Sequence, residues 1–371
     1  MKNYFASILL LFLLAIPVAQ AQEVVWSVDF HALFNNREGG DEMRPDQTFL
    51  FTRLSPEVGV KLATRATTSH LLKGGVTWFQ PVNDRLDGCK VLPTLYYRYQ
   101  YRGRWAVAMG MLPRTQLVER APRYLWSDSM SYHQPNIRGV LAQYHHGNGS
   151  WVELYLDWRQ LQSETRREAF NVDFNGKWFP FSRQGLWLGG YLQYNHLAKC
   201  KNAPEGEGVN DDLTLNPMLG YNWKWGGRCG TTVQLKAGAV INKERARCDS
   251  KWLTASGFVG NAHVRWKFLE AEENIYSGSN LFPLYNRFGS QLNMGDTYYC
   301  SKFYSRTDLV AHIVQNAFVD LNTSFTFHAN KETTGFWQQI SCRVYIDNNI
   351  WKHRHDKKKL RAGRLNSIYT D

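Results

Sequence analysis

The sequence has 371 residues, a formal net charge of +12 and a negative mean hydropathy. After Gln22 no run of residues approaches the roughly 18 consecutive apolar positions of a membrane-spanning helix, which excludes a helical membrane protein. The basic surplus is concentrated at the carboxyl end, where residues 348–371 hold seven Lys and Arg against two Asp, a net charge of +5. With so much of the surplus in one terminal segment, we expect no nucleic-acid partner.

The amino-terminal 21 residues have the pattern of a secretory signal peptide. Lys2 supplies a positive charge, an apolar stretch runs from Ile8 to Val18, and residues 19–21 form a small-x-small cleavage site. No linker and no change in the character of the sequence follows until the basic C-terminal segment. We therefore predict three parts: a signal peptide (1–21), one transmembrane β-barrel domain (22–347) and a basic C-terminal tail (348–371).

The tail and the cysteines allow more than one interpretation. A solvated, disordered tail is the first reading, and binding to anionic lipid or a cell-wall polymer is the alternative. The six cysteines show no C-x-x-C or other metal-ligand spacing, so we expect neither a metal nor a cofactor. Export permits a disulfide between Cys200 and Cys248, which lie in consecutive long loops, and unpaired thiols are the alternative.

Apolar and polar residues alternate in sixteen segments along the chain. In the clearest one, Trp151–Trp158, the even-numbered residues from Val152 onwards are apolar and face one way, while Glu153 and Asp157 face the other. The predicted strands are Val24–Asn35, Gln47–Thr64, His70–Phe79, Leu92–Tyr101, Arg104–Met111, Asn136–His145, Trp151–Gln160, Ala169–Phe179, Leu186–His196, Leu213–Trp225, Thr231–Asn242, Thr254–Lys267, Leu269–Ser277, Ser301–Gln315, Phe318–Ala329 and Phe336–Ile346.

The connections between these strands alternate in length. Those after odd-numbered strands are mostly long, and those after even-numbered strands are short turns such as Arg102-Gly103. Pro56 and Pro217 fall inside two strands and weaken them, because each would remove a ladder hydrogen bond. The pattern predicts an all-β protein: a transmembrane antiparallel up-and-down β-barrel of about 16 strands, with long outer loops and short periplasmic turns. A secreted soluble all-β binding protein is the alternative.

Local strings add to this architecture: Leu54-Ser-Pro-Glu-Val-Gly59, Ser127-Asp-Ser129 with Pro135-Asn-Ile-Arg-Gly139, and Glu164-Thr-Arg-Arg-Glu-Ala-Phe170. With them the chain resembles the general porins of Gram-negative bacteria and a group of uncharacterised porin-like barrels. The resemblance implies a passive channel in the bacterial outer membrane, surrounded by outer-membrane lipid, that passes small hydrophilic solutes and forms a homotrimer. It also implies a third outer loop folded into the lumen. Unlike such porins, this chain continues well past Tyr345.

The third outer loop, Leu112–Gln134, is rich in charge, and the inward faces of the strands carry more cations than anions. We therefore predict weak anion preference, which would strengthen if Arg159, Arg166 and Arg167 gathered with Arg114, Arg120 and Arg123 at a constriction. Wall charges paired with acidic neighbours, or a loop that caps the outside, are the alternatives. The predicted pore-lining or constriction residues are Arg98, Arg114, Arg120, Arg123, Glu153, Asp157, Arg159 and Lys177.

The sequence points away from an enzyme, and we predict no catalytic residue. No G-x-S-x-G motif is present to mark a nucleophilic serine. The neighbouring Ser127, Asp128, Ser131 and His133, with His145 and His146 further on, leave a hydrolase with a site at the barrel rim as an alternative. A plugged structural or adhesive barrel is another.

Overall fold

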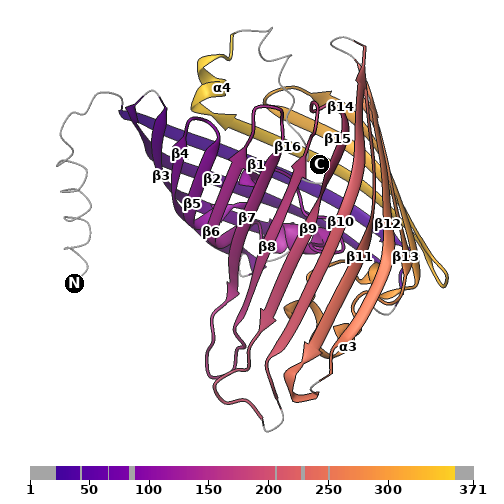
Figure 1. The fold of residues 1–371 in the computed structure, drawn as a ribbon. Coiled ribbons are helices and arrows are strands. Elements are labelled where there is room, and N and C mark those ends of the chain that lie inside the picture. The colour runs from indigo at the N-terminus through magenta and orange to yellow at the C-terminus, as the bar shows by residue number, and fades with distance from the viewer. Residues whose placement is uncertain are drawn as a thin grey trace.

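The protein forms a closed antiparallel barrel (Figure 1). The computed structural model describes residues 22–355 except 42–43, 66, 83–87, 205–206, 227–229 and 250, so the predicted signal peptide and residues 356–371 of the tail lie outside it. Within the described part, each strand pairs with its neighbours in sequence, and β1 pairs with β16. Closure leaves no sheet edge with unpaired backbone groups, as a barrel that crosses lipid requires. The predicted fold class is confirmed.

The strands agree with the predicted segments and differ mainly at their ends. They are β1 (Gln22–Glu38), β2 (Gln47–Arg65), β3 (Thr68–Pro81), β4 (Lys90–Tyr101), β5 (Trp105–Pro113), β6 (Asn136–His145), β7 (Trp151–Gln160), β8 (Ala169–Trp178), β9 (Gly185–Leu197), β10 (Asn210–Trp225), β11 (Thr231–Ala246), β12 (Leu253–Trp266), β13 (Leu269–Gly278), β14 (Phe303–Gln315), β15 (Val319–Asn330) and β16 (Thr334–Asp347).

The two ends of the barrel differ in their connections. At the short-turn end, Arg102 and Gly103 join β4 to β5 with φ angles of 52° and 61°, the positive values that a tight primed hairpin turn requires. α4 (Asn348–Lys352) continues β16 at this same end, and α3 (Tyr285–Phe288) lies at the opposite, long-loop end (Figure 1). The connection 331–333 is short although it lies at the long-loop end, an exception to the predicted alternation.

Both strand prolines are accommodated. Pro56 lies opposite Val28 of β1, but on the β3 side the pairing passes from Leu54 directly to Glu57. Pro217 lies opposite Gly190, and residues 216–217 have no partner in the β11 ladder. Each proline therefore interrupts pairing on one side only, and the strand continues past it.

The outward face carries a belt of exposed apolar side chains, as a wall in contact with acyl chains requires. On β10, for example, Leu215 and Leu219 are 45% and 49% exposed. The belt includes Leu154, Phe174, Leu192, Leu215, Leu219, Ile241, Phe258, Ile275, Leu309, Phe325 and Ile340. Of the helices that the structure describes, none is long and apolar enough to cross a membrane.

Two long loops fold into the lumen. The third outer loop contains η2 (Arg114–Gln116) and α2 (Asp128–His133), and it crosses to the far wall, where Tyr124 donates a hydrogen bond to Asn216 of β10. The connection 279–302, with α3, η4 (Gly289–Gln291) and η5 (Thr297–Cys300), enters beside it. Tyr124, Leu125, Met294, Tyr298 and Tyr299 are buried together in one core between the loops. The inward third loop was predicted, and its inward partner was not.

The cysteines of the described chain are unpaired. Cys200 is buried and Cys248 is exposed, and the disulfide considered between them is not formed. Cys229 lies outside the described residues.

Candidate functional site

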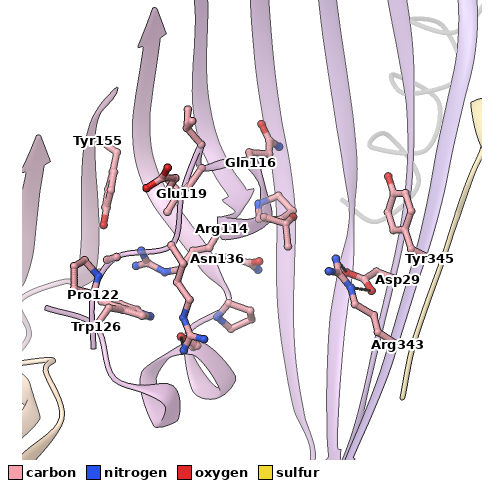
Figure 2. A pocket seen from close by; sticks show the side chains of 18 of the residues that line it. Asp29, Arg114, Gln116, Glu119, Pro122, Trp126, Asn136, Tyr155, Arg343 and Tyr345 are labelled. Atoms are coloured by element: carbon pink, nitrogen blue, oxygen red, sulfur yellow. Dashed lines mark hydrogen bonds and ion pairs between the residues drawn. The ribbon is translucent and has the colours of Figure 1, made fainter. Parts of the chain in front are cut away.

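The lumen holds a cavity of about 1020 Å³. It extends from Trp26 and Asn348 at the short-turn end to the third outer loop, whose residues Arg114–Trp126 contribute much of its lining. Figure 2 shows the loop residues Arg114, Glu119 and Trp126 on one side and the Asp29–Arg343 ion pair, with a 3.0 Å contact, on the other. The cavity is polar and charged, as the alternation of the strands predicted.

The first group of predicted pore-lining residues lies where β4, β6 and β7 face the third loop. Arg98 donates hydrogen bonds of 2.8 Å to the neutral amide oxygens of Gln116 and Gln143. Glu153 accepts from the Val118 backbone at 2.9 Å and from Gln143 at 2.6 Å. These contacts tie the first part of the loop to the barrel wall.

A second group fixes the loop further along. Arg114 forms an ion pair with Asp157 of β7, and its guanidinium carbon lies 3.6 Å from the centre of the Trp126 ring. Lys177 of β8 lies 2.5 Å from Glu119 of the loop. All four charged groups are thus paired across the loop–wall contact, which agrees with the alternative that wall charges meet acidic neighbours.

Arg120 and Arg123 belong to a network that extends to β14. Arg120 and Arg306 both bind Asp128, the latter at 2.8 Å, and Arg123 lies 3.4 Å from Asp308. Burial opposes ionisation of Asp128, but Arg306, Arg123 and Arg120 outweigh it and hold the pKa of this carboxyl well below its usual range. Arg306 and Asp308 were missing from the predicted site, although the alternation of β14 directs both inward.

The remaining arginines do not form one cluster. Arg159 is inward and donates to the Gln291 carbonyl at 2.9 Å, within the second inward loop. Arg167 instead binds the carbonyls of Ala198 and Gly208 in an outer loop, and Arg166 is exposed in the β7–β8 connection. The proposed gathering of Arg166 and Arg167 with the third-loop arginines is therefore wrong. The selectivity role of the other residues stays a prediction.

The residues of the rim-hydrolase alternative lie in two places: Ser127, Asp128, Ser131 and His133 are in or beside α2, where the His133 ring packs on Phe79 at 5.4 Å, and the other two histidines are distant from them. Ser127 caps α2 by accepting from the Met130 backbone, and Ser131 donates to the Ser127 carbonyl. His145 and His146 lie at the short-turn end of the barrel, away from this loop. The described part of the chain contains no group of three or more His, Cys, Asp or Glu that could hold a metal ion.

A row of aromatic and charged residues on the outer wall was not predicted. Directly opposed residues of five adjacent strands, β7 to β11, form it: Trp158, Phe170, His196, Asp211 and Arg245. The Phe170 and His196 rings stack at 4.8 Å, and Trp158 packs on Phe170 at 5.2 Å. We call this set the outer-wall row.

Asp211 is the acceptor at the centre of the row. It accepts hydrogen bonds from Tyr194 at 2.8 Å, from Arg245 at 3.0 Å and from Arg247 at 2.8 and 2.9 Å, and His196 Nδ1 lies 3.3 Å from it. The hydrogen bond to Asp211 raises the pKa of the Arg247 guanidinium. A carboxylate bound by two arginines is fixed in position, so it can in turn orient the imidazole.

The outer-wall row lies just beyond the apolar belt. Along the outward face of β10, Asp211 is followed by Leu213, Leu215 and Leu219, and then by the aromatic residues 221, 223 and 225 at the short-turn end. The aromatic end and the polar end thus bracket the apolar stretch, as girdles do in membrane barrels. This order places the row at the long-loop boundary of the belt, at the level of lipid headgroups.

The row escaped the sequence analysis because of two strand boundaries. We predicted that the tenth strand begins at Leu213 and that the eleventh ends at Asn242, so Asp211 and Arg245 were assigned to loops. The structure extends these strands to Asn210 and Ala246. The available signal was the continued alternation of Lys243 and Arg245 with Glu244 and Ala246.

Comparison with known families decides the class of the protein. Residues 16–349 match the model of a family described as Lipid A 3'-O-deacylase-type. The chain belongs to this family. The prediction that it is not an enzyme is therefore wrong, because the match spans the whole barrel and points to an enzyme. No curated protein matches this sequence.

Solved structures resemble the deacylase-type chain in fold. OpdK of Pseudomonas aeruginosa, solved with vanillate, matches with a TM-score of 0.52 at 9% identity, over 88% of this chain and 99% of that one. OccK2 (OpdF) of the same organism, solved with glucuronate, gives 0.53 at 8% identity over 88% and 98% of the two chains. OccK8 (OprE) gives 0.54 at 8% over the same shares. The predicted porin-like barrel architecture is confirmed, and at this identity the likeness concerns the fold alone.

Proposed function

We propose that this chain is an outer-membrane hydrolase that removes an ester-linked acyl chain from lipid A. One observation carries the proposal: a histidine paired with a fixed carboxylate, His196 and Asp211, lies on the outward side of the wall at the long-loop boundary of the apolar belt. The family supplies the reaction and substrate, and the geometry supplies a site that a membrane lipid can reach from the side. The interior histidines of the described barrel face the lumen instead.

His196 and Asp211 have the arrangement of a general base and its orienting partner. With the proton on Nδ1 donated to Asp211, Nε2 of His196 accepts a proton from water. The resulting hydroxide adds to the ester carbonyl, the bond from the acyl carbon to the sugar oxygen breaks, and the fatty acid leaves. His196 then returns its proton to the sugar oxygen, which completes the hydrolysis.

The flanking residues suit the other demands of this reaction. Arg245, 3.0 Å from Asp211 and 4.5 Å from the Trp252 ring, supplies a cation close to the base. A fixed positive charge there would stabilise the oxyanion that forms when water adds to the ester. Trp158 and Phe170 offer an apolar surface on the other side of His196 for the acyl chain.

Fatty-acid release from lipid A by the purified, refolded barrel tests the proposal. We expect His196→Ala to lower the rate by about 10²- to 10⁴-fold, the usual contribution of a general base. His70→Ala is the matched control, because His70 also faces outward and contacts a tyrosine, Tyr97 at 2.7 Å, but lies at the short-turn end. Equal rates for the wild type and His196→Ala would contradict the assignment.

Solute passage is a second candidate function, favoured by the charged cavity of about 1020 Å³. In this proposal small hydrophilic solutes diffuse through the barrel with weak anion preference, because Arg98 faces the cavity without an acidic hydrogen-bond partner in the described contacts. Single-channel conductance in a planar bilayer tests it. The homotrimer that the porin resemblance implies stays a prediction, which the native mass of the solubilised barrel would check.

A further inference from the structure

The positive charges beside the His196–Asp211 pair outnumber the one negative charge of Asp211. Arg245 and Arg247 both bind this one carboxylate, and Lys243, on the same face of β11 two residues before Arg245, is exposed. Adjacent positions on one face of a strand lie roughly 7 Å apart, which sets the spacing of Lys243 and Arg245 along β11. Arg247 follows in η3 (Arg247–Asp249), and its contact with Asp211 places it on the same side of the row. One carboxylate against three cations leaves a surplus of two positive charges at the lipid boundary.

We propose that Lys243, Arg245 and Arg247 bind the phosphate monoester of an outer-leaflet lipid headgroup. A phosphate monoester carries a charge of about −1.5 to −2 at neutral pH, which matches the surplus. Arginine pairs with phosphate through two parallel hydrogen bonds, and lysine adds a mobile point charge. This inference rests on the proposed function and names the feature by which the site selects its substrate.

The geometry also places this phosphate relative to the scissile ester. The three cations lie on the β11 side of Asp211, and His196 lies on the β9 side. A lipid whose phosphate is held on β11 therefore presents its neighbouring acyl ester across β10, toward His196. Arg247, whose side chain is 47% exposed, keeps donors available to a ligand while it binds Asp211.

Trp252 and Leu253 complete the surface on this side. Arg245 stacks on Trp252 at 4.5 Å, and both Trp252 and Leu253 are exposed and lie outside the core clusters of the described residues. Exposed apolar residues next to a cationic cluster are typical of a surface that meets both an acyl chain and a charged headgroup. A phosphorylated glycolipid has both features in one molecule.

Native mass spectrometry of the detergent-solubilised barrel, titrated with lipid A or with dephosphorylated lipid A, tests the inference. We expect the wild type to bind the phosphorylated lipid at least tenfold more tightly, and Lys243→Gln or Arg247→Gln to reduce this preference several-fold. The matched control is Lys267→Gln, since Lys267 also lies beside a tryptophan, 4.6 Å from the Trp266 ring, but at the short-turn end. Heat-dependent gel mobility verifies that each variant is folded.

Three results would overturn the phosphate assignment. The first is that the wild type binds phosphorylated and dephosphorylated lipid A equally. The second is that Lys243→Gln and Arg247→Gln retain the preference for the phosphorylated lipid. The third is that Lys267→Gln loses this preference as much as those two variants do. Binding is measured as bound lipid mass and hydrolysis as loss of acyl mass. A barrel that cleaves both lipids equally would therefore refute phosphate selection alone, and a barrel that prefers phosphate without cleaving would refute hydrolysis alone.

Discussion

At the scale of single residues, the charge of Asp211 can be removed while the size of its side chain is kept. Asp211→Asn keeps the size of the side chain but loses the carboxylate that accepts from Arg245 and Arg247 and orients His196. We expect fatty-acid release to fall about 10²-fold or more. Residues that act as a unit are not additive, so the double variant Asp211→Asn/His196→Ala should be no slower than His196→Ala.

Asp249→Asn serves as the control for this measurement. Asp249 lies near the same end of the barrel and pairs with Arg287 at 2.5 Å, but its side chain is 54% exposed and lies outside the row. We expect its activity to equal that of the wild type. An additive double variant, with each change slowing the reaction by its own full factor, would show that Asp211 does not act through His196.

Arg98 gives the residue-scale prediction for the lumen. Its partners in the described contacts are the neutral amides of Gln116 and Gln143, so Arg98→Gln removes one charge from the cavity wall and retains an amide that can hydrogen bond. If solutes pass, we expect the anion-to-cation permeability ratio of the conducting barrel to fall. Lys331→Gln, at the outer rim, is the control, and equal ratios in both variants would exclude Arg98 from selectivity.

At the scale of elements, the third outer loop is held by Asp128 of α2. Asp128→Asn removes the carboxylate that joins Arg120 of the loop to Arg306 of β14, although Arg306 keeps its 2.8 Å contact with Asp308, and breaking a buried pair costs about 3–5 kcal/mol. We expect the loop to leave the wall and to become sensitive to limited proteolysis while the barrel persists. Asp249→Asn, which breaks an exposed pair, should cost about 1 kcal/mol or less and leave proteolysis unchanged.

The acid dependence of this attachment follows from the lowered pKa of Asp128. A depressed carboxyl pKa contributes stability that is complete above about pH 4, its ordinary value, and that is lost only as the pH falls through the lower folded value. We therefore expect the wild-type loop to resist proteolysis equally from pH 8 down to about pH 4. Release of the loop near pH 5 or 6 would contradict the arginine network around Asp128.

The elements differ in how well the sequence predicts them. Period-two alternation predicted the strands, because a wall between lipid and water requires it at every position, as in Trp151–Gln160. The inward path of residues 279–302 carries no such period, since its course is decided by contacts such as Asn293 with Glu244. The outer-wall row depends on register across β7–β11, and register between five strands is a property of the closed sheet rather than of any segment.

At the scale of the whole molecule, one barrel presents two chemistries on opposite sides of its wall. Inside, charges join two loops to the strands around a cavity, and outside, an apolar belt ends at a histidine–carboxylate row. The porin-like architecture was predictable because it follows from alternation alone. The proposed hydrolase site was not, because it consists of a few polar residues at strand ends, where the positions of strand boundaries are least certain.

The mass of lipid A before and after incubation with the purified barrel tests this account most directly. We predict the loss of one acyl chain, matched by an equal amount of free fatty acid, and no such loss with His196→Ala. Lipid A of unchanged mass after incubation with a folded, wild-type barrel would contradict hydrolysis at the outer wall.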